Sequence, residues 1–194
     1  MSLSALLQRV VEILDDCRIP YMLTGSLAAA YHATPRATKD IDIVFETDAT
    51  GLSRLVSRLG ESGLYVDHGA ALEALRTHGQ FNAIEPTSGW KIDLIVCKRR
   101  AFSKTEFERR EKATILGIDA ALASIEDVLI AKLEWSKLGD SELQRRDVIE
   151  LLERAWHRLD LEYVEYWVGQ LDLKAEWEAL CARAALPPDG QVTD

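Results

Sequence analysis

The chain has 194 residues, of which 47% are hydrophobic and 28% are charged. This composition is typical of a folded globular protein and excludes general disorder, and the length allows one compact domain with a helical extension. No segment approaches the roughly 20 consecutive apolar residues that cross a bilayer, and acidic residues interrupt the N-terminal segment where a signal peptide would be apolar. The sequence therefore predicts a cytoplasmic protein without a membrane partner.

The formal net charge of -9 is unevenly distributed along the chain. Residues 1–100 contain 11 lysines and arginines against 12 acidic residues, whereas residues 101–194 contain 12 against 20. Binding to nucleic acid depends on contacts between basic side chains and phosphates, so the acidic second half disfavours non-specific binding to RNA or DNA.

Helix and strand patterns alternate in the first half of the chain. Apolar residues at helical spacing predict a helix over 3–16, and a short apolar run predicts a strand over 21–24. A Gly-Ser turn follows this strand directly and leads into an alanine-rich helix that begins at Leu27. Residues 40–45 alternate acidic with apolar side chains at period two, which predicts a strand with one polar face.

The following segment adds two helices and a hairpin. Helical patterns lie near 50–60 and over 70–77. The segments 81–84 and 90–96 read as strands, and the sequence Pro-Thr-Ser-Gly between them is typical of a turn, so the two strands are expected to pair.

Beyond residue 100 the pattern becomes mostly helical. Ser124-Ile125-Glu126-Asp127 resembles a capping box and predicts a helix that runs to about residue 137. The sequence thus predicts an α+β fold in which a small mixed sheet with flanking helices precedes a helical bundle. The expected parts are a core over 1–115 and a C-terminal helical region over 116–186, with helices over 141–156, 160–171 and 174–185 and a disordered tail over 187–194.

Three acidic residues in the predicted strands are candidate metal ligands. Asp40 and Asp42 leave the same face of one strand, and Asp93 lies between Ile92 and Leu94 in another. Neighbouring carboxylates repel, whereas a divalent cation turns this repulsion into binding energy, and oxygen ligands suit Mg²⁺ or Mn²⁺. If the two strands are neighbours, the three carboxylates converge. For an isolated Asp-x-Asp pair, a polar strand edge would be the simpler interpretation.

A trio of this kind is what two-metal nucleotidyl transfer requires. One ion lowers the pKa of the attacking hydroxyl, the other holds the triphosphate, and the third carboxylate, Asp93, can also accept the proton. Gly25 and Ser26 lie between a strand and a helix, where free N–H groups and the serine hydroxyl can donate to phosphate oxygens. The alternative is that Ser26 only caps the helix.

The order of these motifs resembles the DNA polymerase β-like nucleotidyltransferase superfamily, in which a Gly-Ser or Gly-Gly turn precedes an Asp-x-Asp pair. Here Leu23-Thr24-Gly25-Ser26 is followed, after thirteen residues, by Asp40-Ile41-Asp42-Ile43. Asp93 falls where the superfamily carries its third carboxylate. The resemblance covers about residues 20–97 and implies the nucleotidyltransferase fold, a divalent metal such as Mg²⁺, and an NTP as substrate.

A narrower resemblance extends into the helical half. Residues 35–42 read Pro-Arg-Ala-Thr-Lys-Asp-Ile-Asp and look like the corresponding motif of abortive-infection type nucleotidyltransferases, which include toxins of toxin–antitoxin pairs. Those proteins carry a lysine and an Arg-Asp pair further along, which Lys132 and Asp147 match. The resemblance implies that Lys132 and Asp147 help to hold the nucleotide or organise the site.

Charged residues outside the acidic trio have more than one interpretation. Lys132 lies in a mostly apolar helical segment, where an ammonium needs an anionic partner. This partner can be Asp147 or a bound triphosphate. Alternatively, the lysine side chain extends to solvent. Arg36 can clamp a phosphate or form a surface ion pair, and Thr38 can brace the site through hydrogen bonds.

Together these features predict a Mg²⁺- or Mn²⁺-dependent enzyme that transfers an NMP from an NTP to an acceptor. The superfamily offers an RNA end such as that of tRNA, a protein, or a small molecule such as an aminoglycoside as the acceptor. A toxin role would add an antitoxin partner protein. The non-enzymatic alternative is a catalytically silent module that binds NTP, and the intact carboxylates argue against it.

Overall fold

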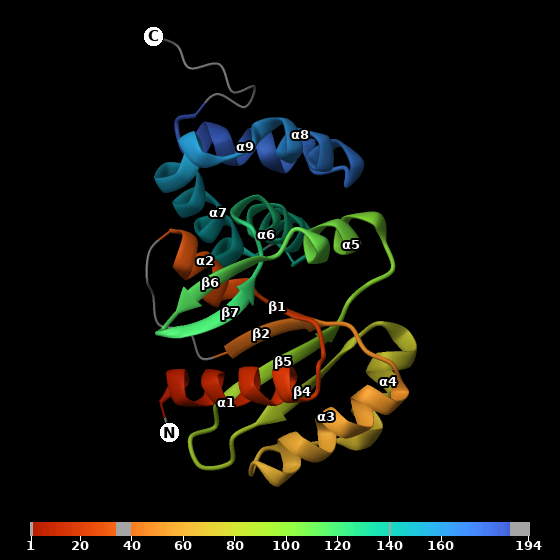
Figure 1. Ribbon diagram of the computed structural model, residues 1–194. Helices are drawn as coiled ribbons and strands as arrows, with labels where there is room; N and C mark the ends of the chain where they lie inside the picture. Colours follow the sequence, from red (N-terminus) through yellow and green to blue (C-terminus); the bar gives the residue numbers. More distant parts are fainter. Residues whose placement is uncertain (1, 34–39, 140, 187–194) are drawn as a thin grey trace. The chain divides into compact units, whose positions relative to one another are not determined.

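The computed structural model describes residues 2–33, 40–139 and 141–186. The chain divides into two compact units, one formed by Met1–Leu27 with Ala37–Ala123 and the other by Ala28–Arg36 with Ser124–Asp194 (Figure 1). Within the described residues, every strand belongs to the first unit, and the second unit is helical.

The first unit is built around a seven-stranded mixed sheet with the strand order β3-β4-β5-β2-β1-β7-β6. β2 pairs with β5 in parallel and β1 pairs with β7 in parallel, whereas all other neighbouring strands are antiparallel. This arrangement confirms the predicted α+β class and the predicted hairpin of β4 and β5. The strands are β1 Tyr21–Thr24, β2 Asp40–Phe45, β3 Tyr65–Val66, β4 Gln80–Ile84, β5 Lys91–Val96, β6 Glu111–Ile115 and β7 Ile118–Leu122.

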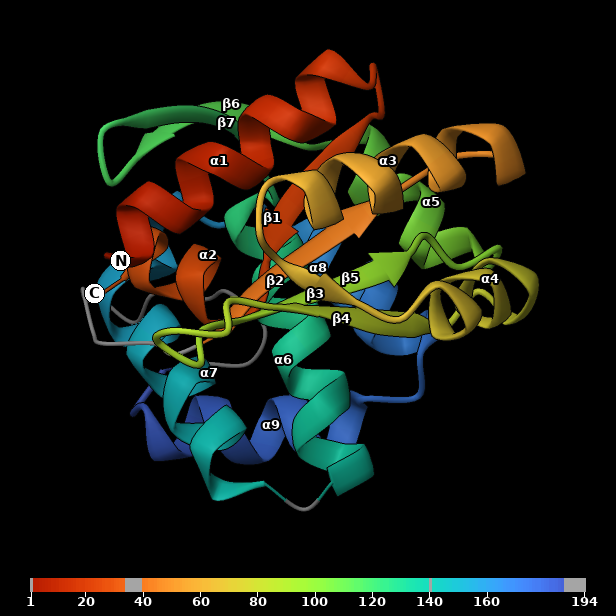
Figure 2. The same cartoon turned by 90° about the horizontal axis from the view of Figure 1, so that it is seen from below.

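Helices α1 and α3 lie side by side against one face of this sheet (Figure 2). Their apolar stripes are buried, with Leu6 and Val10 of α1 and Leu52 and Leu55 of α3 fully shielded from solvent. A polar N-cap side chain accepts a hydrogen bond from the first turn of α1, α3 and α4, as expected where a helix must begin. The helices of this unit are α1 Leu3–Asp16, α3 Ala49–Glu61, α4 His68–Thr77 and α5 Ala101–Glu108.

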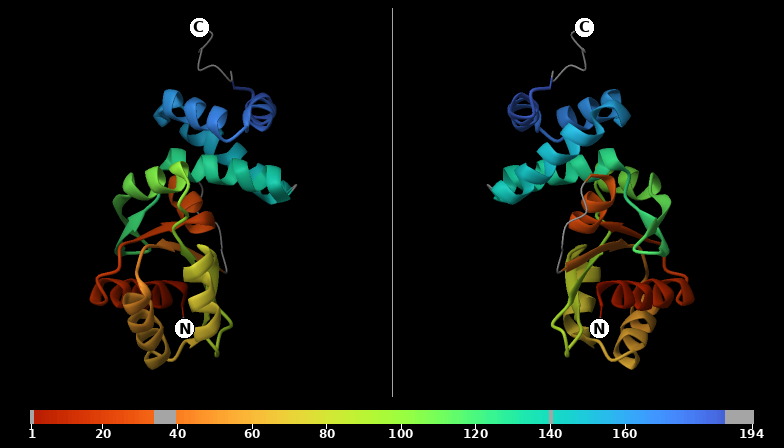
Figure 3. Two further views of the ribbon diagram at one scale, coloured as in Figure 1. Left: turned by 90° about the vertical axis from the view of Figure 1, so that its right-hand side faces the viewer. Right: turned by 90° about the vertical axis from the view of Figure 1, so that its left-hand side faces the viewer.

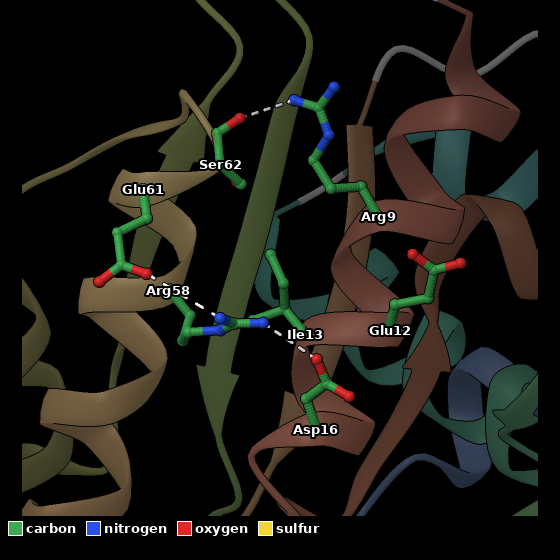
Figure 4. A pocket seen from close by; sticks show the side chains of 7 residues that line it. All are labelled: Arg9, Glu12, Ile13, Asp16, Arg58, Glu61 and Ser62. Atoms are coloured by element: carbon green, nitrogen blue, oxygen red, sulfur yellow. Dashed lines mark hydrogen bonds and ion pairs between the residues drawn. The ribbon is translucent and has the colours of Figure 1, made fainter.

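Polar side chains bridge the outer rims of α1 and α3 around a shallow groove (Figure 4). Arg9 donates to the carbonyl oxygen of Ser62 over 3.0 Å, and Arg58 forms an ion pair with Asp16 at 3.0 Å. Arg58 and Asp16 are both largely exposed, so their pair adds little to stability. The side chains that line the groove include both positive and negative groups.

Strands β6 and β7 correct the prediction of a mostly helical chain beyond residue 100, which is wrong for residues 111–122. The two strands form a hairpin in which Ile115 pairs with Ile118. Leu116 and Gly117 make the tight turn with positive φ angles of 52° and 82°. β7 also pairs with β1 at Leu122, and this contact with a distant strand decides the structure of a segment whose own pattern is weak.

The second unit is a helical bundle. Its helices α6, α7, α8 and α9 pack on one another, and α8 and α9 lie side by side (Figure 3). Ser124 caps α6 as predicted, because its hydroxyl oxygen accepts from the Asp127 N–H at 3.3 Å and its O–H donates to the Asp127 carboxylate at 2.8 Å. The bounds are α2 Gly25–His32, α6 Ile125–Gly139, α7 Glu142–Ala155, η1 Trp156–Arg158, α8 Leu161–Gln170 and α9 Lys174–Arg183.

Some predictions fall outside the described residues. The expected disordered tail over 187–194 and residues 35–39 of the predicted motif lie there. In the parts of the chain that the structure describes, no helix has the length and apolar character needed to span a membrane.

Candidate active site

The register of two neighbouring strands sets the candidate carboxylates together. β2 and β5 are parallel neighbours in the sheet (Figure 2). In their register, Asp42 lies directly opposite Asp93, and Asp40 lies opposite Lys91. Ile41 and Ile43 point to the other face and are fully buried, whereas Asp42 is half-buried and Asp40 is exposed. The sequence pattern of alternating acid and isoleucine therefore produces one acidic patch at the start of β2.

Gly25 lies against the Asp42 side chain from the other neighbouring strand. β1 pairs antiparallel with β2, so that Thr24 is opposite Asp42 and the chain turns into α2 at Gly25. Gly25 has a φ of +63°, and a Cβ atom at this position would lie 2.1 Å from Asp42 Oδ2. Only glycine allows this turn and this close approach. Ser26, the second residue of α2, is half-buried beside it.

Replacing Gly25 by alanine is expected to cost about 1–2 kcal/mol of stability through the left-handed backbone and to displace the Asp42 carboxylate. Because a misplacement of about 1 Å in an active site can lower a rate about a hundredfold, we expect kcat to fall by about that factor. Steady-state kinetics and thermal unfolding measure the two effects.

Gly63→Ala provides the matched control. Gly63 also has a positive φ, of +89°, but a Cβ there would meet no atom within 4 Å. The control should lose stability and keep its activity. Equal activity in the Gly25→Ala variant and the wild type would contradict the expected effect of Gly25 on the position of the Asp42 carboxylate.

Asp93 is held by a neighbouring lysine that the sequence interpretation missed. Lys91 Nζ lies 3.1 Å from Asp93 Oδ2, whereas Asp93 Oδ1 is buried and has no hydrogen-bond partner among the described residues. The pKa of Lys91 is raised, chiefly by its hydrogen bond to Asp93, with smaller contributions from Asp40 and Asp42. Side chains alternate between the two faces of a strand, so the sequence already places Lys91 on the same face of β5 as Asp93.

The donor set of this patch fits a hard divalent cation. All three candidate ligands offer carboxylate oxygens, and the buried Asp93 Oδ1 lacks the hydrogen bond that a buried oxygen normally has. Within residues 2–33, 40–139 and 141–186, no three acidic, histidine or cysteine side chains are already grouped as ligands of one ion. Metal binding at this patch therefore requires the side chains to turn toward one another.

Lys132 and Asp147 form an ion pair inside the helical unit. Lys132 Nζ lies 2.7 Å from Asp147 Oδ2 and donates to Gln144 Oε1 at 3.0 Å. The two charged side chains are 4% and 2% exposed, so Lys132 does not extend to solvent. Asp147 is therefore one of the partners that the sequence predicted for Lys132. The pair joins α6 to α7.

The structure does not describe the remaining predicted binding residues. Arg36 and Thr38 lie outside the described residues, so their proposed contacts with phosphate stay predictions.

Comparison with known proteins identifies a sequence family and solved structures that are similar to this chain. The sequence model of a family described as aminoglycoside-2''-adenylyltransferase matches residues 6–97, somewhat less than half of the chain. This match includes Gly25, Asp40, Asp42 and Asp93. A search of curated protein sequences found no match.

Three solved structures, two of them of one protein, resemble this chain. The solution structure of the antibiotic-resistance factor ANT(2'')-Ia shares 13% identity with a TM-score of 0.54, over 93% of this chain and 92% of that one. Its crystal structure with adenylyl-2''-tobramycin shares 13% identity with a TM-score of 0.53, over 92% and 97% of the two chains. The lincomycin-bound lincosamide antibiotic adenylyltransferase LnuA shares 14% identity with a TM-score of 0.54, over 78% and 96%. The chain has the nucleotidyltransferase-like fold.

Proposed function

We propose that this protein is a metal-dependent nucleotidyltransferase that transfers an NMP from an NTP to an acceptor hydroxyl and releases pyrophosphate. The observation that carries the proposal is the register of β2 and β5, which sets Asp42 beside Asp93, with Gly25 pressed against Asp42 on the other side. The nucleotidyltransferase-like fold and the family match over residues 6–97 support it. The catalytic core is proposed to span 1–115 together with β7, and the helical region to begin at α6 and extend to residue 186.

Each residue of the patch has a proposed role in this reaction. A divalent cation such as Mg²⁺ or Mn²⁺, when bound, would lower the pKa of the attacking hydroxyl and neutralise charge at phosphorus. Asp40 and Asp42 would hold it, and Asp93 would act as a ligand and as the base that accepts the hydroxyl proton. Gly25 and Ser26 would seat the phosphates at the start of α2, where free backbone N–H groups are available. The roles proposed for Arg36, Thr38, Lys132 and Asp147 are in binding the nucleotide.

A small polyhydroxylated molecule is the acceptor that the observations favour. The matching family is named for adenylyl transfer to aminoglycosides, and the similar structures include an adenylylated tobramycin complex and a lincosamide adenylyltransferase. The excess of acidic over basic residues, which gives the chain a net charge of -9, suits a cationic small molecule better than a polyanionic RNA. The names of this family and of these structures refer to adenylyl groups, which favours ATP as the donor.

Mass spectrometry of acceptors tests this proposal. The protein is incubated with ATP, Mg²⁺ and separate pools of aminoglycosides, lincosamides, tRNA and protein, and each pool is searched for the mass of an added NMP. We expect the adduct on a small molecule. An adduct on tRNA or protein alone would contradict the proposed acceptor class and keep the reaction, whereas ATP binding without any adduct would favour a silent binding module.

The relationship to abortive-infection type nucleotidyltransferases stays a prediction of the sequence. It rests on residues 35–42, of which 35–39 lie outside the described residues, and on Lys132 and Asp147. A toxin role and an antitoxin partner rest on that relationship alone. Suppression of growth on expression in a host cell, relieved by a neighbouring gene, is the result that would support them.

A further inference from the structure

Lys91 occupies a special place in the carboxylate patch. Its ammonium lies 3.1 Å from Asp93 Oδ2, and its backbone is the direct partner of Asp40 across the β2–β5 register. The Asp93 side chain is only 13% exposed and that of Lys91 is 37% exposed, so the pair is partly shielded from water.

Electrostatics explain why a cation is needed at this position. Asp42 and Asp93 are direct neighbours across two parallel strands, and like charges on neighbouring strands destabilise a sheet. The Lys91 ammonium, which contacts Asp93, offsets part of this repulsion. However, a lysine supplies one charge and only hydrogen-bond donors, so a divalent cation competes with it for the same Asp93 oxygen.

We propose that Lys91 is the internal counterion of the metal-free site, and a positioning residue that gives up Asp93 when a divalent cation binds. The exchange releases Asp93 Oδ2, and the buried Oδ1, which has no hydrogen-bond partner among the described residues, is the second oxygen that Asp93 can offer the cation. The inference rests on the proposed function, because it takes Asp40, Asp42 and Asp93 as the ligands. It makes Lys91 a regulator of metal affinity.

The test measures Mn²⁺ binding without any turnover. Isothermal titration calorimetry gives the Mn²⁺ dissociation constant of the full chain for wild type, Lys91→Met, Lys91→Arg and Asp42→Asn. Because Lys91→Met removes the competing charge, we expect it to bind Mn²⁺ about threefold to tenfold more tightly. We also expect a lower Tm in EDTA and a larger rise of Tm with Mn²⁺.

Two variants control for charge and for general effects on the sheet. Lys91→Arg keeps the positive charge and should retain the wild-type affinity for Mn²⁺. Lys112→Met removes an exposed lysine from β6, at the far edge of the same sheet, and should change neither the affinity nor the response of Tm to Mn²⁺.

The possible results separate the two proposals. If wild type binds Mn²⁺ and Asp42→Asn does not, the metal site stands. The Lys91 inference then fails if Lys91→Met binds Mn²⁺ no more tightly than wild type, or if Lys91→Arg behaves like Lys91→Met. If wild type binds Mn²⁺ no better than Asp42→Asn, the proposed metal site fails, and the inference fails with it.

Discussion

Asp42→Asn is expected to lower the rate of nucleotidyl transfer by at least about a thousandfold while the protein stays folded. Asp42 lies at the centre of the candidate site, opposite Asp93 on one side and against Gly25 on the other. Asparagine keeps the shape that Gly25 requires and removes the negative charge that would hold a divalent cation. The measurement is kcat with saturating ATP and Mg²⁺, together with Tm in EDTA.

Asp119→Asn is the matched control for this substitution. Asp119 is an exposed aspartate on β7 of the same sheet, where it accepts a hydrogen bond from Thr114. Its replacement should leave kcat within about twofold of wild type. If Asp42→Asn kept wild-type kcat, Asp42 would have no catalytic role, and a large loss in both variants would point to damage of the sheet.

Breaking the buried ion pair of the helical unit should have the largest effect on stability. Lys132→Met removes the ammonium that contacts the Asp147 carboxylate, which is 2% exposed. Asp147→Leu removes the carboxylate that contacts the Lys132 ammonium. Removing one partner of a buried pair typically costs about 3–5 kcal/mol, because the remaining charge is uncompensated. Urea denaturation of each single variant measures the loss in the free energy of unfolding.

The double variant Lys132→Met/Asp147→Leu separates structure from function at this pair. Replacing both charges by apolar side chains removes the uncompensated charge, so we expect most of the lost stability to return. If Lys132 and Asp147 help to bind nucleotide, as the resemblance implies, the KM for ATP should stay raised. Wild-type stability combined with wild-type KM would make the pair a feature of the helical core alone.

The parts of the site that follow from local pattern were predictable. Alternation of acid and isoleucine over 40–43 predicts a strand with both carboxylates on one face. In β5, the same alternation places Asp93 on the face opposite to Ile92 and Leu94. A glycine between strand and helix was recognisable as a turn. Its contact with Asp42 was not, because that contact depends on the pairing of β1 with β2.

Features that depend on pairing between distant segments could not be read from the sequence. The β6–β7 hairpin has few β-branched residues and an unusual Leu-Gly turn, and its place in the sheet comes from β1. The sequence alone does not assign Lys91 to the site, and only the fold places it opposite Asp40 and in contact with Asp93. The apolar surroundings of Lys132 indicate from the sequence that its ammonium needs an anion, whereas its contact with Asp147 depends on the packing of α6 on α7.

A single measurement with labelled ATP tests the central claim most directly. The protein is given ATP labelled in either the α- or the γ-phosphate, with Mg²⁺ and an aminoglycoside pool, and is compared with an Asp40→Asn/Asp42→Asn variant. If the protein is a nucleotidyltransferase acting through these carboxylates, wild type transfers the α-label alone and the variant transfers none. Transfer of the γ-label, no transfer by wild type, or equal transfer by both proteins would contradict the account.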